Sequence, residues 1–293
     1  MKVAVIGANG QLGADVVAAF TAEKHSVASL NHRDVEIADL ASVQRTLEGI
    51  RPDLVINTAA YSNVDKCETE AVQAFAANAL GARNVALATR ALDSALIHIS
   101  TDYVFDGRKP TPYTEADAPN PLSVYGNSKL AGEFFVRNNN PRHFVVRVSG
   151  IYGRHPCRAK DGLNFVEMML KLAREREVLR VVNDQLVTPT PTVDVARQLV
   201  ALSRLTDYGI YHASSEGSCS WYEFAQAIFE IAGTKVRLAP VPSSEFPTKA
   251  VRPRNSVMEN VALKAKSINV FRPWKAGLEE YLAQTPADSF RPA

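Results

Sequence analysis

A glycine-rich turn directly after the first apolar segment constrains the fold more than any other feature. The segment Val3–Ile6 has the character of a β-strand, and Gly7–Gly13, with the sequence GANGQLG, precedes a helical pattern. Glycine permits the positive φ angles of a tight turn, and N–H groups at the start of a helix attract pyrophosphate. This context predicts a dinucleotide-binding turn, whereas the alternative is a structural turn. The residues expected to bind the dinucleotide are Gly7, Gly10, Gln11, Leu12 and Gly13.

Short apolar segments recur over the first 150 residues and alternate with Ala- and Leu-rich helical patterns. They lie at Val3–Ile6, Ser26–Leu30, Leu54–Asn57, Leu96–Ser100 and Phe144–Val148. Nearly continuous hydrophobicity is typical of parallel strands that helices cover on both faces. The alternation therefore predicts an α/β fold with a Rossmann-type, doubly wound parallel sheet.

The pattern becomes irregular and rich in proline after residue 150, which is better suited to a substrate lid. Within this part, Val195–Leu205 and Tyr208–Ala213 have the character of a helix and a strand that return to the main sheet. We therefore expect an NAD(P)-binding domain over residues 1–150, with a return near 185–215. Residues 151–293 are expected to form mainly a smaller, discontinuous C-terminal substrate-binding domain.

Composition excludes several classes of partner and compartment. The formal net charge is only +2 and the basic residues are scattered, which argues against binding nucleic acid or an anionic membrane surface. The cysteines Cys67, Cys157 and Cys219 are too far apart for a zinc site and odd in number, which argues against a disulfide framework. No apolar segment approaches the roughly 18 residues that span a bilayer. We therefore expect a cytoplasmic protein without a membrane segment.

The end of the second strand bears on the choice of cofactor. A carboxylate that would bond the ribose hydroxyls of NAD is missing there, and the sequence is Asn31-His32-Arg33. Arg33 is a candidate to hold the 2′-phosphate of NADP, whereas the alternative is a solvated surface arginine. Asp39 either contacts adenine or caps the helix that begins near Ala41. We expect NADPH as the cofactor, with NADH as the alternative.

Tyr125 and Lys129 are four positions apart at the start of a predicted helix, so both project from one face. An ammonium about 4 Å away contributes about 4 kcal/mol at an effective dielectric of about 20, enough to lower the pKa of a phenol substantially. The strand ending in Ser100-Thr101-Asp102-Tyr103 brings further hydroxyls to the edge of the sheet where ligands bind. This favours proton-transfer chemistry over a surface Tyr-Lys pair.

Several motifs together resemble the dTDP-4-dehydrorhamnose reductase family of extended short-chain dehydrogenases/reductases. They are Gly7–Gly13, Asn57–Tyr61, Val64–Lys66, Ser100–Gly107, Tyr125–Glu133, Asn183–Gln185, Pro189-Thr190 and Arg252–Ser256, so the resemblance covers nearly the whole chain. It implies that Thr101 is the catalytic hydroxyl, Tyr125 the proton donor and Lys129 the ligand of the cofactor ribose. The hydride then comes from nicotinamide.

The resemblance also implies residue roles around the ligands. Gly10–Leu12, Asp39, Leu40, Ala59, Ala60 and Tyr61 line the cofactor, and Thr101, Asp102 and Tyr103 face the sugar. The implied reaction is reduction of the 4-keto group of a nucleotide-diphosphate deoxysugar, dTDP-4-dehydro-L-rhamnose to dTDP-L-rhamnose. A near-neutral protein must supply its anion contacts locally, so Arg252 or Arg254 is expected to pair with the diphosphate; the alternative is a solvated loop. The resemblance also allows a homodimer.

The sequence departs from the family pattern at two places. Relatives commonly carry a tryptophan after the R-x-S segment, but Ser149 is followed by Gly150, which leaves the identity of the sugar open. Some relatives bind magnesium through glutamates at a dimer contact. Asp15 matches one of these, but Val193 occupies the place of another, beside Asp194. We therefore expect no metal.

Two other functions compete with reduction. Nucleotide-sugar dehydratases resemble this chain but typically have Asp then Glu after the catalytic Thr, whereas Tyr103 follows Asp102 here. Another nucleotide-sugar reductase or an epimerase stays open. From a different class, the regulatory subunit of methionine adenosyltransferase resembles the same reductases and acts by binding an enzyme. The presence of Thr101, Tyr125 and Lys129 favours catalysis.

Overall fold

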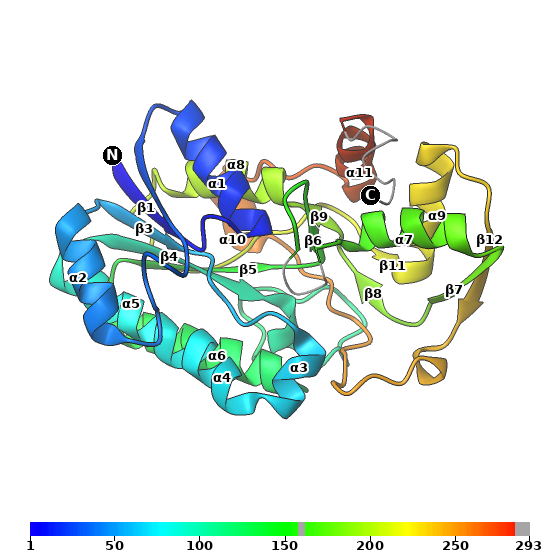
Figure 1. Cartoon of the computed structure of the whole chain (residues 1–293), viewed down its shortest axis with the longest axis horizontal. Helices are drawn as coiled ribbons and strands as arrows, with labels where there is room; N and C mark the ends of the chain where they lie inside the picture. Colours follow the sequence, from blue (N-terminus) through cyan, green and yellow to red (C-terminus); the bar gives the residue numbers. More distant parts are fainter. Residues whose placement is uncertain (158–161, 285–293) are drawn as a thin grey trace.

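A six-stranded, wholly parallel sheet forms the centre of the protein, whose computed structural model describes residues 1–157 and 162–284 (Figure 1). Its strands are β1 (Lys2–Ile6), β2 (Ser26–Leu30), β3 (Leu54–Asn57), β4 (Ala95–Thr101), β5 (His143–Val148) and β10 (Gly209–His212), in the order β10-β5-β4-β3-β1-β2. The doubly wound α/β fold predicted from the sequence is confirmed. The strand expected at 208–213 is β10, which pairs with β5.

Helices cover both faces of this sheet, as its apolar strands require. One face packs against α1 (Gln11–Ala22), α8 (Thr192–Leu202) and α10 (Val261–Ala265). The other packs against α2 (Leu40–Ile50), α5 (Ala82–Ala91) and α6 (Val124–Asn139). The connection before α5 consists of α3 (Val64–Thr69), α4 (Ala71–Phe75) and the π-helix η1 (Ala76–Gly81), and a 3₁₀ turn, η2 (Asp102–Val104), follows β4. Most residues of the sheet are therefore buried, and the edge strand β2 is the most accessible of the six strands.

A second apolar core lies beside the carboxyl ends of the sheet strands. It is formed by α7 (Phe165–Glu175), α9 (Trp221–Ala232), α11 (Trp274–Ala283) and the parallel pair β7 (Val178–Val182) and β12 (Arg237–Val241). Short pairs complete this part: β6 (Ile151–Tyr152) with β9 (Thr190–Pro191), and β8 (Leu186–Val187) with β11 (Cys219–Ser220); η4 (Ser243–Glu245) follows β12. In Figure 1 these elements lie at the end of the molecule away from α2.

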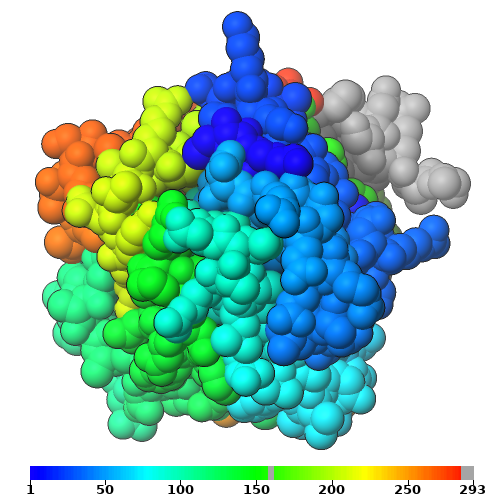
Figure 2. Space-filling view, turned by 90° about the vertical axis from the view of Figure 1, so that its left-hand side faces the viewer, coloured from blue at the N-terminus to red at the C-terminus, as the bar shows by residue number. Residues whose placement is uncertain are grey.

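Segments that are distant in sequence share the opposite end of the molecule. Figure 2 shows this end, where the N-terminal surface in blue and cyan borders yellow-green and orange surface from after residue 190. This follows from the parallel pairing of β10 with β5 and from the packing of α8 against α1. No helix within the described residues is long and apolar enough to cross a membrane.

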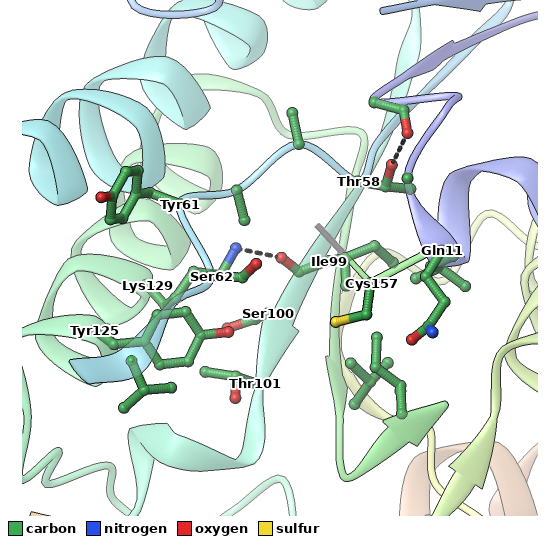
Figure 3. A pocket seen from close by; sticks show the side chains of 18 of the residues that line it. Gln11, Thr58, Tyr61, Ser62, Ile99, Ser100, Thr101, Tyr125, Lys129 and Cys157 are labelled. Carbon is green, nitrogen blue, oxygen red and sulfur yellow. Dashed lines mark hydrogen bonds between the residues drawn. The ribbon is translucent and has the colours of Figure 1, made fainter. Parts of the chain in front are cut away.

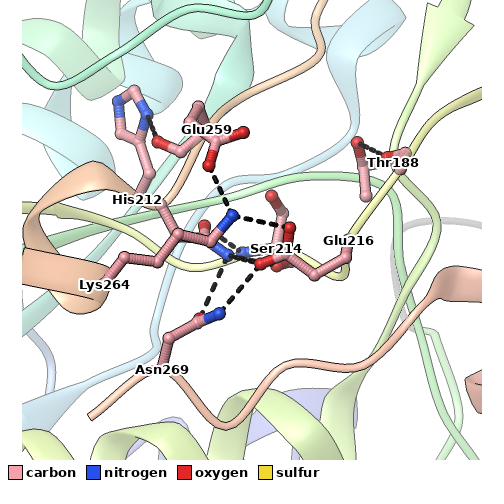
Figure 4. Close-up of polar contacts among 9 residues, drawn as sticks. Thr188, His212, Ser214, Glu216, Glu259, Lys264 and Asn269 are labelled. Atoms are coloured by element: carbon pink, nitrogen blue, oxygen red, sulfur yellow. Dashed lines mark hydrogen bonds and ion pairs between the residues drawn. The ribbon is translucent and has the colours of Figure 1, made fainter. Parts of the chain in front are cut away.

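A polar cluster joins the loop after β10 to the C-terminal segment (Figure 4). Lys264 Nζ lies 2.7 Å from Glu216 Oε2 and also contacts Glu259. Asn260 Nδ2 donates to the Ser214 carbonyl at 2.7 Å, and Asn269 Nδ2 donates to Glu216 Oε1 at 2.8 Å. These bonds fix the path of the chain between β10 and α11, which belong to the two different cores.

The strand order reverses next to β1. The chain passes from β1 to β2 on one side and then to β3 on the other side of β1. The connections after β1 and β3 therefore diverge at their carboxyl ends, and open α/β sheets bind ligands in the resulting crevice. Here Thr58 Oγ1, directly after β3, donates to the Ile6 carbonyl at the end of β1 at 2.8 Å. This hydrogen bond holds the ends of β1 and β3 together at the base of the crevice.

Candidate active site

A cavity of about 800 Å³ opens at the carboxyl ends of the sheet strands and extends to the second core. It begins at the glycine-rich turn, passes the end of β4 and the start of α6, and ends between α7 and α9. Residues that line it include Gly7, Gly10, Gln11, Leu12, Gly13, Ala59, Ala60, Tyr61, Thr101, Asp102, Tyr103, Tyr125 and Lys129. The structure therefore brings most of the candidate residues to one site.

The glycine-rich turn is packed so closely that two of its positions cannot carry a side chain. Gly7 has a φ of 81°, and a Cβ atom there would lie 2.7 Å from Thr58 Oγ1. A Cβ atom at Gly13 would lie 2.1 Å from the Gly7 carbonyl oxygen. The turn therefore leads directly into α1 and lines the cavity at the N-terminus of this helix, where the first backbone N–H groups have no partner within the helix and are suited to bind pyrophosphate.

Gln11 links this turn to the chain that follows β6. Its Nε2 donates to the carbonyl oxygens of Gly153 at 3.2 Å and His155 at 3.1 Å. Gln11 is almost fully buried by these contacts. Its amide therefore holds the segment after β6 over the turn, in addition to lining the cavity. The sequence also predicts a polar insertion over residues 154–161, of which residues 158–161 lie outside the described residues.

The end of the cavity beside β2 differs from the sequence-based expectation. The cavity is lined there by Asn31, His32 and Val35–Ala38, whereas Arg33 is exposed and lies outside the lining. Asp39 also lies outside it, and its side chain accepts a hydrogen bond from the Ala41 N–H at 2.9 Å. Of the two roles considered for Asp39, the structure shows the helix cap. Leu40 is the first residue of α2 and does not line the cavity.

The segment Ala59–Tyr61 crosses the cavity after β3. The Tyr61 N–H donates to Asn78 Oδ1 at 2.8 Å, and Asn78 Nδ2 donates to the Tyr61 carbonyl at 3.0 Å. Asn78 Nδ2 also donates to Ser128 Oγ in α6 at 3.0 Å. The loop that lines the cavity is therefore attached to the helix that carries Tyr125 and Lys129.

Tyr125 and Lys129 lie in the first two turns of α6. Ser123 caps this helix by accepting a hydrogen bond from the Gly126 N–H at 3.1 Å. Lys129 is buried, and its Nζ donates to the Ile99 carbonyl in β4 at 2.6 Å. In Figure 3 the Tyr125 hydroxyl points toward β4, the strand that ends at Thr101. The two side chains thus face the same edge of the sheet.

Burial sets the protonation of this pair. It raises the pKa of the Tyr125 phenol well above its ordinary value, against a smaller opposing effect of the hydrogen bond with Thr101. Burial also lowers the pKa of Lys129 to about 8, although Glu133 opposes this. We expected Lys129 to lower the Tyr125 pKa; in the structure desolvation is the larger effect, and it favours the neutral phenol. Tyr125 is therefore suited to hold a proton and donate it.

Thr101 and Asp102 lie at the end of β4, beneath Tyr125. Thr101 Oγ1 accepts a hydrogen bond from the Tyr103 N–H at 3.2 Å and lies 3.0 Å from Asp102 Oδ1. Ser149 Oγ donates to Asp102 Oδ2 at 2.8 Å. Both Thr101 and Asp102 are buried in the protein but border the cavity.

The two candidate arginines lie outside the cavity lining. Arg252 Nη2 forms an ion pair with Asp65 Oδ2 at 2.7 Å, and its guanidinium opposes the desolvation that raises the pKa of the Tyr103 phenol. Arg254 is exposed. Their neighbours Pro253 and Ser256 do line the cavity. The segment therefore borders the site, but a direct role for either guanidinium stays a prediction.

The sequence-based prediction missed the aromatic wall at the far end of the cavity. Phe165 of α7 lies 4.7 Å from the Trp221 ring and 5.4 Å from the Phe224 ring, measured between ring centroids, and all three residues line the cavity. Cys157, Gln185 and Val187 also line it. Trp221 lies within a Ser220-x-x-Glu223 capping box, which signals the start of a helix but does not show what the helix faces.

The described residues contain no group of three or more His, Cys, Asp or Glu side chains placed to hold a metal ion. Asp15, the candidate from the sequence, bonds the Thr192 hydroxyl at 2.5 Å. Asp194 forms ion pairs with Arg197 at 3.0 Å and with Arg272 at 2.9 Å. Both carboxylates therefore have protein partners, and the expectation that no metal binds stays a prediction.

A dinucleotide turn after the first strand of a doubly wound sheet, with Tyr125 and Lys129 facing the same cavity, defines an extended short-chain dehydrogenase/reductase. The family model described as the RmlD substrate binding domain matches residues 1–286. The chain therefore belongs to the dTDP-4-dehydrorhamnose reductase family.

Individual relatives match over nearly their full length. The chain is 40% identical to the spore coat polysaccharide biosynthesis protein SpsK of Bacillus subtilis, covering 97% of each. It is 39% identical to the dTDP-4-dehydrorhamnose reductase of Sinorhizobium fredii, covering 87% of this chain and 88% of the relative. The Bacillus anthracis dTDP-4-dehydrorhamnose reductase, solved in complex with NADP, has a TM-score of 0.93 and 39% identity, covering 97% and 99%.

Proposed function

We propose that this protein uses NADPH to reduce the 4-keto group of a nucleotide-linked deoxysugar, with dTDP-4-dehydro-L-rhamnose as substrate and dTDP-L-rhamnose as product. The observation that carries the proposal is that Thr101, Tyr125 and Lys129 line the same cavity as the dinucleotide turn. The relatives' names and the NADP-bound structure of one of them support both substrate and cofactor.

Tyr125, Thr101 and Lys129 each have a separate role in the proposed reduction. Tyr125 donates its proton to the carbonyl oxygen, and Thr101 binds the same oxygen from the end of β4. Lys129 holds the cofactor ribose and supplies positive charge near the phenol, which stabilises the developing phenolate. When bound, the dihydronicotinamide ring supplies the hydride. The closely packed turn at Gly7 and Gly13 fits the pyrophosphate because it leaves no side chain at these two positions and leads into the N-terminus of α1.

We propose a matching division of the chain. Residues 1–150, with the return near 185–215, bind the cofactor, and residues 151–293 mainly bind the sugar nucleotide. The separate apolar core formed by α7, α9 and α11 supports this division. Its aromatic residues Phe165, Trp221 and Phe224 supply ring faces at the end of the cavity away from the dinucleotide turn. We propose that these rings form the wall of the substrate site, in place of the tryptophan that relatives commonly carry at the position of Gly150.

The substrate is tested by a screen of nucleotide-linked 4-keto-6-deoxy sugars, followed by the loss of NADPH absorbance. We expect the largest kcat/KM with dTDP-4-dehydro-L-rhamnose. A relative from Streptomyces niveus, 36% identical, is named a dTDP-4-keto-6-deoxy-D-glucose reductase, so that sugar is the essential comparison. A protein that turns over none of these sugars but binds an adenosyltransferase stoichiometrically would be a regulatory subunit instead.

Arg33 is expected to select NADPH over NADH. The guanidinium is exposed beside Asn31 and His32, which line the cavity, so it can turn toward a 2′-phosphate at this rim. Arg33→Ala should raise the KM for NADPH by about tenfold or more, since a charge-assisted contact is worth about 1.5–3 kcal/mol. The KM for NADH should change little. Equal changes with both cofactors would show that Arg33 is a solvated surface residue.

Arg252 and Arg254 are expected to contact the diphosphate of the sugar nucleotide. Because Arg252 is paired with Asp65, it can act without moving only if the diphosphate shares its remaining N–H groups. Replacing both arginines by Ala should raise the KM for the sugar nucleotide by about tenfold and leave NADPH binding unchanged. Arg108→Ala, an exposed arginine at another loop, is the control. An unaltered KM would exclude both residues from the site.

A homodimer and a cytoplasmic location are also proposed. Exposed apolar side chains on the packed elements α4, η1 and α6 support the dimer; they belong to Val72, Phe75, Leu80 and Phe134. Light scattering on the purified protein measures the oligomeric state. We expect the mass of two chains, and Phe134→Glu should reduce it to one. A monomeric wild type would rule the dimer out.

A further inference from the structure

Asp102 contacts the reacting centre through another residue, because its carboxyl lies against the Thr101 hydroxyl. Thr101 Oγ1 and Asp102 Oδ1 are 3.0 Å apart, and Thr101 Oγ1 also accepts the Tyr103 N–H at 3.2 Å. The Tyr125 side chain lies beside Thr101 (Figure 3), and the Thr101 hydroxyl opposes the effect of burial on the pKa of the phenol. A hydroxyl has one proton and two lone pairs. The state of Asp102 therefore decides which way the Thr101 proton points.

If Asp102 is ionised, it has no proton to give, and the bond at 3.0 Å must use the proton of Thr101. Thr101 then offers the cavity only a lone pair and competes with the substrate for the proton of Tyr125. If Asp102 is protonated, it donates to Thr101 Oγ1 instead. The Thr101 proton is then free for the substrate oxygen or for Tyr125.

We propose that Asp102 works as a protonated carboxylic acid that donates to Thr101 and, through Thr101, returns a proton to Tyr125 after each reduction. This rests on the proposed function. The carbonyl carbon accepts the hydride, and its oxygen takes the Tyr125 proton. The resulting phenolate takes the proton of Thr101, and Thr101 takes the proton of Asp102. Asp102 is left as a carboxylate and recovers a proton from water when the product leaves the cavity.

The surroundings of Asp102 suit this role. It is buried yet lines the cavity, and burial raises its pKa, against the hydroxyls of Ser256, Ser149 and Thr101, which lower it. The titratable groups facing it are the phenols of Tyr103 and Tyr125. Beyond Tyr103 lie Arg252 and Asp65, which neutralise each other in an ion pair, while the ammonium of Lys129 is bonded to a backbone carbonyl.

Tyr125 itself shows why a return path is needed. Its side chain is only partly exposed at the cavity wall, and desolvation raises its pKa, so a phenolate left at this position is costly in free energy. Asp102, acting through the Thr101 hydroxyl, can reprotonate this phenolate quickly. Thr101 and Asp102 belong to the end of β4 and the start of η2, so they are positioned by the sheet and not by a movable loop.

The test compares Asp102→Asn with the wild type on a reducible nucleotide sugar. The Asn amide can donate to Thr101 Oγ1 like the protonated acid, but it cannot release a proton. We therefore expect NADPH oxidation in the first turnover to stay near the wild-type rate, while the steady-state rate falls by about 10²-fold, the lower end for a lost proton-transfer group. An unchanged steady-state rate would overturn the proposal, and so would an equal loss in both phases.

Ser149→Ala provides a second test with a defined sign. Removing the hydroxyl at 2.8 Å takes away a bond that favours the carboxylate, so the pKa of Asp102 should rise further. Because the acid form is the active one, the fall of kcat on the alkaline side should move to higher pH. Ser203→Ala, whose hydroxyl bonds only the Val200 carbonyl in α8, is the matched control. If the alkaline fall of kcat occurs at the same pH in Ser149→Ala as in the wild type, the proposed proton transfer from Asp102 is contradicted.

A spectroscopic measurement separates this proposal from the proposed function. In the NADP-bound protein, the infrared difference between wild type and Asp102→Asn should contain the C=O band of a neutral carboxylic acid at a pH where exposed carboxylates are ionised. Absence of that band would overturn the proposal whatever the substrate is. A wild type that shows the band but reduces no nucleotide-linked ketosugar would instead count against the proposed function.

Discussion

Tyr125→Phe should lower kcat by about 10²-fold or more, which is the usual scale for a lost general acid. The substitution keeps the ring and its packing, including the edge-to-face contact with Tyr103 at 6.1 Å, and removes only the hydroxyl. Burial keeps the pKa of this phenol high, so the wild-type residue enters the reaction with its proton in place. The fold and the affinity for NADPH should therefore survive.

The measurement is the single-turnover rate of NADPH oxidation with saturating nucleotide sugar, together with NADPH binding by fluorescence. Tyr208→Phe is the matched control, because its hydroxyl bonds Arg142 far from the cavity lining and its loss should leave kcat unchanged. Near wild-type turnover in Tyr125→Phe would show that another residue is the acid. A loss of NADPH binding would instead indicate a structural role.

Lys129→Met extends this experiment to the second member of the pair. The pKa of Lys129 is lowered to about 8, so the wild-type ammonium is lost as the pH rises through that value. In the free enzyme kcat/KM should fall over the same range, and Lys129→Met should abolish this dependence. The variant should also bind NADPH more weakly, whereas Tyr125→Phe should not. The two substitutions thus separate ribose binding from proton donation.

The sheet could be predicted from the sequence because buried parallel strands are continuous apolar segments. The bounds predicted for β2 and β3 agree with the structure, those of β1 and β5 differ by one residue at the start, and those of β4 differ by one residue at each end. The glycine-rich turn could be predicted equally well, because its residues are contiguous and the need for glycine arises within the turn itself. Both features depend on short-range rules that a single sequence contains.

The rest of the site depends on contacts between distant parts of the chain. Phe165 and Trp221 meet in the cavity wall only because α7 and α9 pack together, and no local pattern shows this. The direction of the Tyr125 pKa shift could not be predicted either. The spacing to Lys129 is visible in the sequence, but the desolvation of the phenol is not. The sequence left two roles open for Asp39, a contact with adenine or a helix cap. The structure shows that its side chain caps α2.

Arg147→Met should destabilise the fold by about 3–5 kcal/mol, because it leaves a buried carboxylate without its cation. Arg147 donates to Glu133 through two bonds, Nε to Oε1 at 2.9 Å and Nη2 to Oε2 at 2.7 Å. Both side chains are at most 2% exposed. Glu133 also accepts the Ser100 hydroxyl at 2.5 Å, so the pair joins α6 to β4 and β5 directly beneath the site.

Urea unfolding of the variant measures this loss, and two controls identify its cause. Arg204→Met removes a cation from the exposed pair with Glu23, at 65% and 49% exposure, and should cost less than about 1 kcal/mol. The double variant Glu133→Gln with Arg147→Met removes both buried charges and should regain part of the stability lost in the single variant. If Arg147→Met costs no more than Arg204→Met, the buried pair does not hold α6 against the sheet, and another contact must position Tyr125 and Lys129.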